Sequence, residues 1–148
     1  MDGLMVVLRF VHVVSGVLWV GMFAFVFRFL TPAVQELGPD GGKVMAVLQR
    51  RGAMTALPVI ALFTIGSGLW LMQRSPVGRK AGFIVGGAAA LIAFILGAFV
   101  MRPLMTKAMA AKDPAEAQRL RARGDTVGRL VAAFLFIAVG AMAVARYI

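Results

Sequence analysis

Residues 81–101 read AGFIVGGAAALIAFILGAFVM, and none of these 21 side chains is charged. A helix rises about 1.5 Å per residue, so a stretch of this length crosses the roughly 30 Å hydrocarbon core of a bilayer. Three further stretches, residues 10–27, 52–73 and 130–145, are also free of charge. The chain is 61% hydrophobic and only 15% charged. Soluble domains average about 45–50% apolar and about a quarter charged, so this composition excludes a soluble monomer.

These stretches predict an all-α fold, namely a polytopic membrane protein built as a four-transmembrane-helix bundle. We expect a single membrane domain over residues 1–148. Arg9 and Arg129 extend the first and last stretches, because each lies near a helix end where a long side chain can reach the headgroups. The expected spans are residues 5–30, 52–73, 81–101 and 127–146.

The positive charges predict how the spans are oriented. Eleven of the 16 Lys and Arg residues lie in or beside the loops 31–51 and 102–126, and the chain has a net charge of +10. The positive-inside rule places these two loops in the cytoplasm and both termini outside. We therefore expect a multi-pass protein of a bacterial inner (cytoplasmic) membrane that contacts the lipid bilayer, either as a homodimer or in a larger membrane complex. The basic residues lack interleaved aromatic side chains, which argues against nucleic acid as a partner.

Local signals predict where individual helices begin and end. Thr31-Pro32 disfavours helical backbone before the proline and predicts a bend or an end of the first span, whereas Pro58 predicts a kink in the second. Asp113-Pro114-Ala115-Glu116 has the pattern of a helix N-cap followed by proline at the first helical position. We expect a short helix from there, with Gly124 as its stop signal.

Several classes of chemistry are excluded by composition. The chain has no Cys, which rules out disulfides, thiolate metal sites and c-type haem attachment. All six Asp and Glu residues lie in expected loops or at the N-terminus, so no intramembrane carboxylate is available for acid–base catalysis. No phosphate-binding glycine loop is present. No enzymatic activity is assigned.

His12 is the only histidine and the only side chain in the four uncharged stretches that titrates near neutral pH. An ionisable group inside a bilayer is by default a candidate functional residue. Helical spacing places Arg9, Gly16 and Trp19 on the same face as His12. A b-type haem needs such a face, with a nitrogen ligand, a small residue beside the ring, an aromatic wall and a cation for a propionate.

Other roles for His12 remain open. The commonest role of such a residue is structural, as a hydrogen-bond donor to a carbonyl or a hydroxyl group of a neighbouring helix. Copper, bound by His12 together with Met5, ranks behind haem b as a cofactor, and a proton relay ranks behind both. Because a single chain offers no second histidine, haem would need His/Met ligation, a five-coordinate site or two copies of the chain.

Residues 8–21, LRFVHVVSGVLWVG, resemble the first helix of the CopD-like group of small bacterial membrane proteins, in which a His is followed seven residues later by Trp and then by Gly. The same start is similar to that of HemJ-type protoporphyrinogen oxidases, and residues 28–32 and 66–70 provide further matches. The resemblance implies an integral membrane bundle, with copper handling in the first group and haem-linked porphyrinogen oxidation in the second. The residues that carry over are His12, Trp19, Gly21 and Arg28.

From these observations we predict a small cytoplasmic-membrane protein that binds b-type haem or a metal through His12, in redox chemistry or copper handling. The alternative is a non-catalytic accessory or scaffold subunit of a larger membrane complex. In that alternative, the basic loops and the small-residue faces of the helices would serve assembly.

Overall fold

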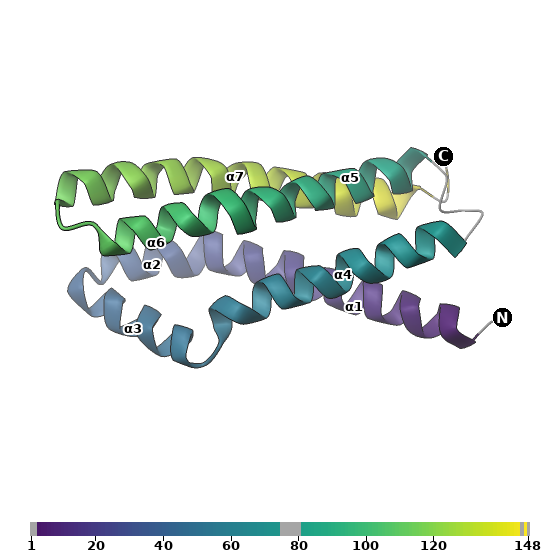
Figure 1. Ribbon diagram of the computed structural model, residues 1–148, viewed down its shortest axis with the longest axis horizontal. Helices are drawn as coiled ribbons and strands as arrows, with labels where there is room; N and C mark the ends of the chain where they lie inside the picture. The colour runs from purple at the N-terminus through teal and green to yellow at the C-terminus, as the bar shows by residue number, and fades with distance from the viewer. Residues whose placement is uncertain (1–2, 75–80, 146, 148) are drawn as a thin grey trace. The chain divides into compact units, whose positions relative to one another are not determined.

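The computed structural model describes residues 3–74, 81–145 and 147, and this part of the chain is helical and contains no strand (Figure 1). The predicted all-α fold class is therefore confirmed. Four helical stretches are long and apolar enough to cross a membrane, as expected of a multi-pass membrane protein. They are Gly3–Glu36, Thr55–Arg74, Ala81–Ala110 and Pro114–Val144.

The chain divides into two compact units, Met1–Ser75 and Pro76–Ile148. The first unit is a hairpin of two long antiparallel helices, and two shorter helices form the connection between them (Figure 1). In chain order its helices are α1 (Gly3–Phe25), α2 (Thr31–Glu36), α3 (Pro39–Arg50) and α4 (Ala53–Arg74). The helices α1 and α4 pack against each other along their apolar lengths.

The second unit is also an antiparallel hairpin, in which α5 and α6 both pack against one long helix (Figure 1). Its helices are α5 (Ala81–Ile95), α6 (Arg102–Ala110) and α7 (Pro114–Val144). Small side chains line the contact: Gly82, Gly86, Ala89 and Ala93 of α5 are buried. Such residues allow the helix backbones to approach closely, and van der Waals packing then holds the pair together in lipid.

Of the two outcomes predicted at Thr31-Pro32, an end of the first span is wrong, because the chain stays helical from α1 into α2, and a bend stays a prediction. Thr31 has helical angles, with φ −61° and ψ −49°. A π-helical turn, Val26–Leu30, precedes the proline, and the Thr31 N–H and hydroxyl groups both donate to the carbonyl of Val26. A π turn contains an extra residue, which accommodates the proline ring and its missing N–H group. A second π turn, Leu96–Met101, precedes Pro103 in the same way.

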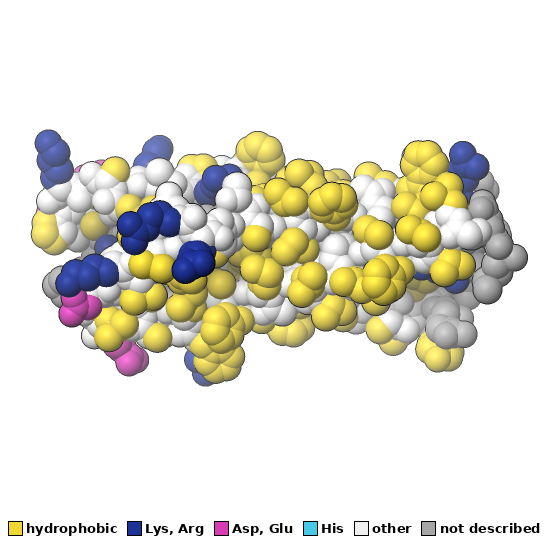
Figure 2. Space-filling model, turned by 90° about the horizontal axis from the view of Figure 1, so that it is seen from below, with side chains coloured by type: hydrophobic (Ala, Val, Ile, Leu, Met, Phe, Trp, Pro, Cys, Tyr) yellow, Lys and Arg dark blue, Asp and Glu magenta, His cyan; other side chains and the backbone are white. Residues whose placement is uncertain are grey.

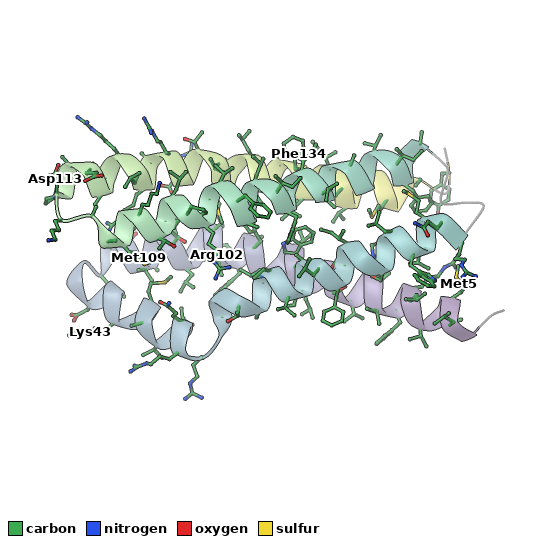
Figure 3. All side chains as sticks on the ribbon, viewed as in Figure 1. Met5, Lys43, Arg102, Met109, Asp113 and Phe134 are labelled. Atoms are coloured by element: carbon green, nitrogen blue, oxygen red, sulfur yellow. The ribbon has the colours of Figure 1, made fainter. Side chains whose placement is uncertain are left out.

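The predicted helix start at Asp113 is confirmed, but the predicted stop at Gly124 is wrong. The Asp113 side chain accepts a hydrogen bond from the N–H of Ala115 at 3.0 Å, at the α6–α7 turn (Figure 3). Gly124 lies inside α7, which continues to Val144. It is buried there because the Met105 side chain of α6 packs directly against its Cα. Helices α2, α3, α6 and the start of α7 thus occupy most of the segments predicted as loops.

The two hairpins share a short sequence motif at an offset of 74 residues. Residues 24–30, AFVFRFL, and 98–104, AFVMRPL, are identical at five of seven positions. In the first hairpin, the closest neighbour of a Cβ built on Gly68 is His12. The residues 74 positions later are Met142 and Gly86, and these two are also in contact in the second hairpin. A short motif and one helix–helix contact therefore recur at the same offset, whereas Pro32 and Pro103, each preceded by a π turn, are 71 residues apart.

We predict that Gly82→Ala destabilises the second hairpin. A Cβ at this position would lie 2.7 Å from the Cβ of Ala145 and 2.9 Å from the carbonyl oxygen of Ala141, so the two backbones must separate. The expected cost is about 1–3 kcal/mol, seen as a lower midpoint of thermal unfolding in detergent. Gly87→Ala is the matched control, because a Cβ there meets nothing within 4 Å. Equal midpoints for the two variants would contradict the packing described.

Candidate functional site

His12 lies on α1, half-buried, with its imidazole ring turned toward α4. Its Nδ1 atom is 2.8 Å from the backbone carbonyl oxygen of Thr64. Because a carbonyl oxygen can only accept, Nδ1 carries a proton and donates it. In the neutral ring this tautomer leaves the lone pair on Nε2. Among the residues that the structure describes, none forms a hydrogen bond with Nε2.

Three buried hydroxyl groups accompany the imidazole and form with it a polar seam, defined as His12, Ser15, Thr64 and Ser67. The Thr64 hydroxyl lies 2.9 Å from that of Ser15, which in turn donates to a carbonyl of its own helix. Ser67 Oγ lies 3.4 Å from His12 Nδ1 and donates to a carbonyl one turn earlier in α4. The three hydroxyl groups and Nδ1 of His12 therefore find partners inside the hairpin, as a low-dielectric environment requires.

Two glycines bring the helices together at the seam. A Cβ on Gly68 would lie 2.7 Å from His12 Cε1 and 3.1 Å from Nδ1, so the imidazole rests directly on the α4 backbone. A Cβ on Gly16 would lie 3.5 Å from the Thr64 methyl group, an ordinary contact distance. Any side chain at position 68 would push the ring away from the Thr64 carbonyl. Gly68 thus positions His12.

The structure brings His12 and Gly16 to the same contact between α1 and α4, where Gly16 faces Thr64. Trp19 is buried, with 5% of its surface exposed, and Arg9 is exposed and forms no described ion pair. Their shared role around a haem stays a prediction.

Met5 lies toward the N-terminal end of α1 and is half-buried (Figure 3). It precedes His12 by seven residues, an axial rise of about 10 Å. Two extended side chains would have to bridge this distance to hold one copper ion, and such a shared site stays a prediction. In the part of the chain that the structure describes, no group of three or more His, Cys, Asp or Glu side chains is placed to hold a metal ion.

Sequence reasoning did not identify Thr64 and Ser67 as the partners of His12. A signal was present, because both are polar residues in an otherwise apolar span and lie three positions apart, on one face of a helix. With Gly68 next to Ser67, this face combines hydrogen-bonding groups with space for a neighbouring side chain. The pattern alone does not show which residue of a neighbouring helix this face contacts, because that depends on how the two helices are rotated.

Comparisons of the chain with protein-family models, with curated proteins and with solved structures each gave no match. The geometry of the polar seam is therefore the basis for assigning a function.

We predict that Gly68→Ala displaces the imidazole and breaks its bond to the Thr64 carbonyl. Since His12 is the only histidine, ¹⁵N-histidine labelling gives the NMR spectrum of a single ring. The wild-type ring should show a protonated, hydrogen-bonded Nδ1 and an unprotonated Nε2, and Gly68→Ala should lose this signature. Gly66→Ala, whose Cβ would meet nothing within 4 Å, should keep it. A wild-type ring protonated only at Nε2 would overturn the assignment.

Proposed function

We propose that the protein binds a b-type haem within the membrane, with Nε2 of His12 as an axial ligand. The observation that carries this proposal is the hydrogen bond from Nδ1 to the Thr64 carbonyl oxygen, 2.8 Å long. A histidine that ligates a metal almost always donates its other ring N–H to a carbonyl or a carboxylate, which fixes the tautomer and the ring orientation. The seam provides this second partner and leaves Nε2 available.

Haem fits the available ligands better than a bare metal ion does. A haem iron brings four porphyrin nitrogens and needs only one or two from the protein. A copper ion bound by protein side chains needs several ligands of its own, and Met5 is the candidate for a second one. The resemblance of residues 8–21 to HemJ-type and CopD-like proteins also supports a redox or metal-handling role.

Each residue of the site would have a defined task. The Thr64 carbonyl orients the imidazole and makes Nε2 a stronger donor, while Gly68 provides the space in which the ring lies. Arg9, one turn toward the N-terminus, is exposed and can meet a propionate. The bound haem would supply one-electron chemistry.

A second candidate function, that of an accessory or scaffold subunit, is favoured by the same hydrogen bond interpreted structurally. The bond joins α1 to α4, and interhelical polar contacts of this kind contribute about 0.6–2 kcal/mol in membranes. In this case His12 serves packing, and another donor of similar size can replace it. The two candidate functions therefore differ in whether Nε2 of His12 binds a cofactor or has no role.

The haem proposal predicts a Soret absorption band in protein purified from haem-replete cells. His12→Ala should reduce the band at least tenfold, because the axial nitrogen is lost. Ser67→Ala is the matched control, since it changes the seam and keeps the ligand. A wild-type protein without a Soret band, even after haem is added, would disprove the proposal. The scaffold candidate then predicts co-purification with larger membrane partners and an unchanged complex in His12→Gln.

We also infer an inner-membrane orientation with the connecting helices in the cytoplasm and both termini outside, from the excess of Lys and Arg in these segments. The turn between α6 and α7, where Ala111 has extended backbone, is a suitable insertion point for reporters. Alkaline phosphatase, which is active only outside the cytoplasm, should be inactive at this turn and active after residue 148. The opposite pattern would reverse the orientation.

A further inference from the structure

The second unit carries an unbalanced cluster of positive charge on α6 and α7. Between residues 102 and 129 there are seven Lys and Arg residues and only three carboxylates. All seven cations are exposed. The one salt bridge among the described residues, Lys43–Asp40 at 2.7 Å, lies in the other unit. The seven cations are Arg102, Lys107, Lys112, Arg119, Arg121, Arg123 and Arg129, and none of them has an ion-pair partner among the described residues.

The length of α7 places part of this cluster at the depth of the lipid headgroups. With 31 residues, α7 is about 46 Å long, and the hydrocarbon core takes up only about 30 Å of that length. Its last 15 residues, 130–144, are free of charge, so the excess lies at its N-terminal end. Arg119, Arg121 and Arg123 fall just outside the hydrocarbon, in the headgroup layer.

Helix α6 brings further cations to the same level. Arg102 directly follows the uncharged residues 81–101, so it lies at the edge of the hydrocarbon. The Met105 side chain packs against Gly124 of α7, which sets the two helices side by side at this depth. Lys107, half a turn beyond Met105, is therefore near the level of Arg121. We name Arg102, Lys107, Arg119, Arg121 and Arg123 the basic belt.

The spacing of the arginines indicates what kind of partner they face. Residues two positions apart point to opposite sides of a helix, so Arg121 projects away from the side of α7 that carries Arg119 and Arg123. A folded protein partner would dock on one side, whereas lipid headgroups surround a membrane helix. In the view of Figure 2, most of the visible Lys and Arg side chains lie in one half of the molecule, and hydrophobic side chains predominate over the rest.

We propose that the basic belt binds the phosphate groups of anionic phospholipids. Guanidinium groups form paired hydrogen bonds with phosphate oxygens, and arginine is the residue best suited to this contact. In a zwitterionic lipid the ammonium group beside the phosphate offsets the attraction, whereas an anionic lipid keeps its net charge. Each cation near the membrane surface is expected to raise the affinity for an anionic lipid about fivefold. This site is independent of His12 and of any haem.

The test measures binding of phosphatidylglycerol and phosphatidylcholine to the full-length protein, by lipid titration in detergent micelles with native mass spectrometry. The wild-type protein should prefer phosphatidylglycerol, and added salt should weaken the preference. The triple variant Arg119→Gln, Arg121→Gln, Arg123→Gln should bind phosphatidylglycerol about a hundredfold more weakly. The variant with Lys in these three positions should keep most of the affinity.

The matched control is the triple variant Lys43→Gln, Arg50→Gln, Arg51→Gln, which removes three cations from α3 and its end in the first unit. It should bind phosphatidylglycerol as the wild type does. Circular dichroism verifies that each variant is folded. If the triple arginine variant does not fold, the single variant Arg121→Gln replaces it, and its affinity for phosphatidylglycerol should fall about fivefold. Equal binding of the two lipids by the wild type, or equal losses in both triple variants, would overturn the proposal. Displacement of the lipid by inorganic phosphate would identify a free-anion site instead.

Discussion

The hydrocarbon core of a membrane offers no water, so each polar group in a spanning helix needs a partner within the protein. This constraint explains why the described chain is helical, since a helix satisfies its own backbone. It also explains the side chains of the first hairpin. Ser15, Thr64 and Ser67 are buried and hydrogen-bonded, and no buried side-chain nitrogen or oxygen among the described residues lacks a partner. Nδ1 of His12 obeys the same rule through the Thr64 carbonyl, whereas Nε2 has no hydrogen-bond partner among the described residues.

The same constraint accounts for the way the helices tolerate proline. Pro32 and Pro103 each follow a π-helical turn, and after each turn an N–H group bonds to a carbonyl five residues earlier. At Thr31 the hydroxyl group donates to that same carbonyl. Helix-breaking residues are tolerated in membrane helices when π turns and hydroxyl groups provide the missing partners. Both helices can then extend beyond the hydrocarbon, which allows α6 to reach the charged start of α7.

The sequence was sufficient for the four spans and for His12, because length without charge and a lone intramembrane imidazole are local properties. It did not correctly predict the path of the chain at Gly124, where a helix stop was expected, or at Pro32, where an end of the first span was expected. Local propensity alone makes Gly124 a stop, but the packing of Met105 against it overrides that propensity. The partners of His12 were not predicted because they depend on the rotation of α4 about its own axis. The close contact at Gly68, where the imidazole lies directly on the α4 backbone, shows which face of α4 is turned toward His12.

The second hairpin offers a comparison for the contact that His12 makes in the first. The second hairpin packs in the same register with Gly86 and Met142, which stand where the first has His12 and Gly68. An apolar contact therefore suffices to close a hairpin of this geometry. A polar residue in the hydrocarbon carries a cost in free energy, and His12 meets that cost through the Thr64 carbonyl oxygen at 2.8 Å, with the Ser67 hydroxyl group 3.4 Å away. The first hairpin thus differs from the second in carrying an imidazole at this contact, and the proposed function depends on that difference.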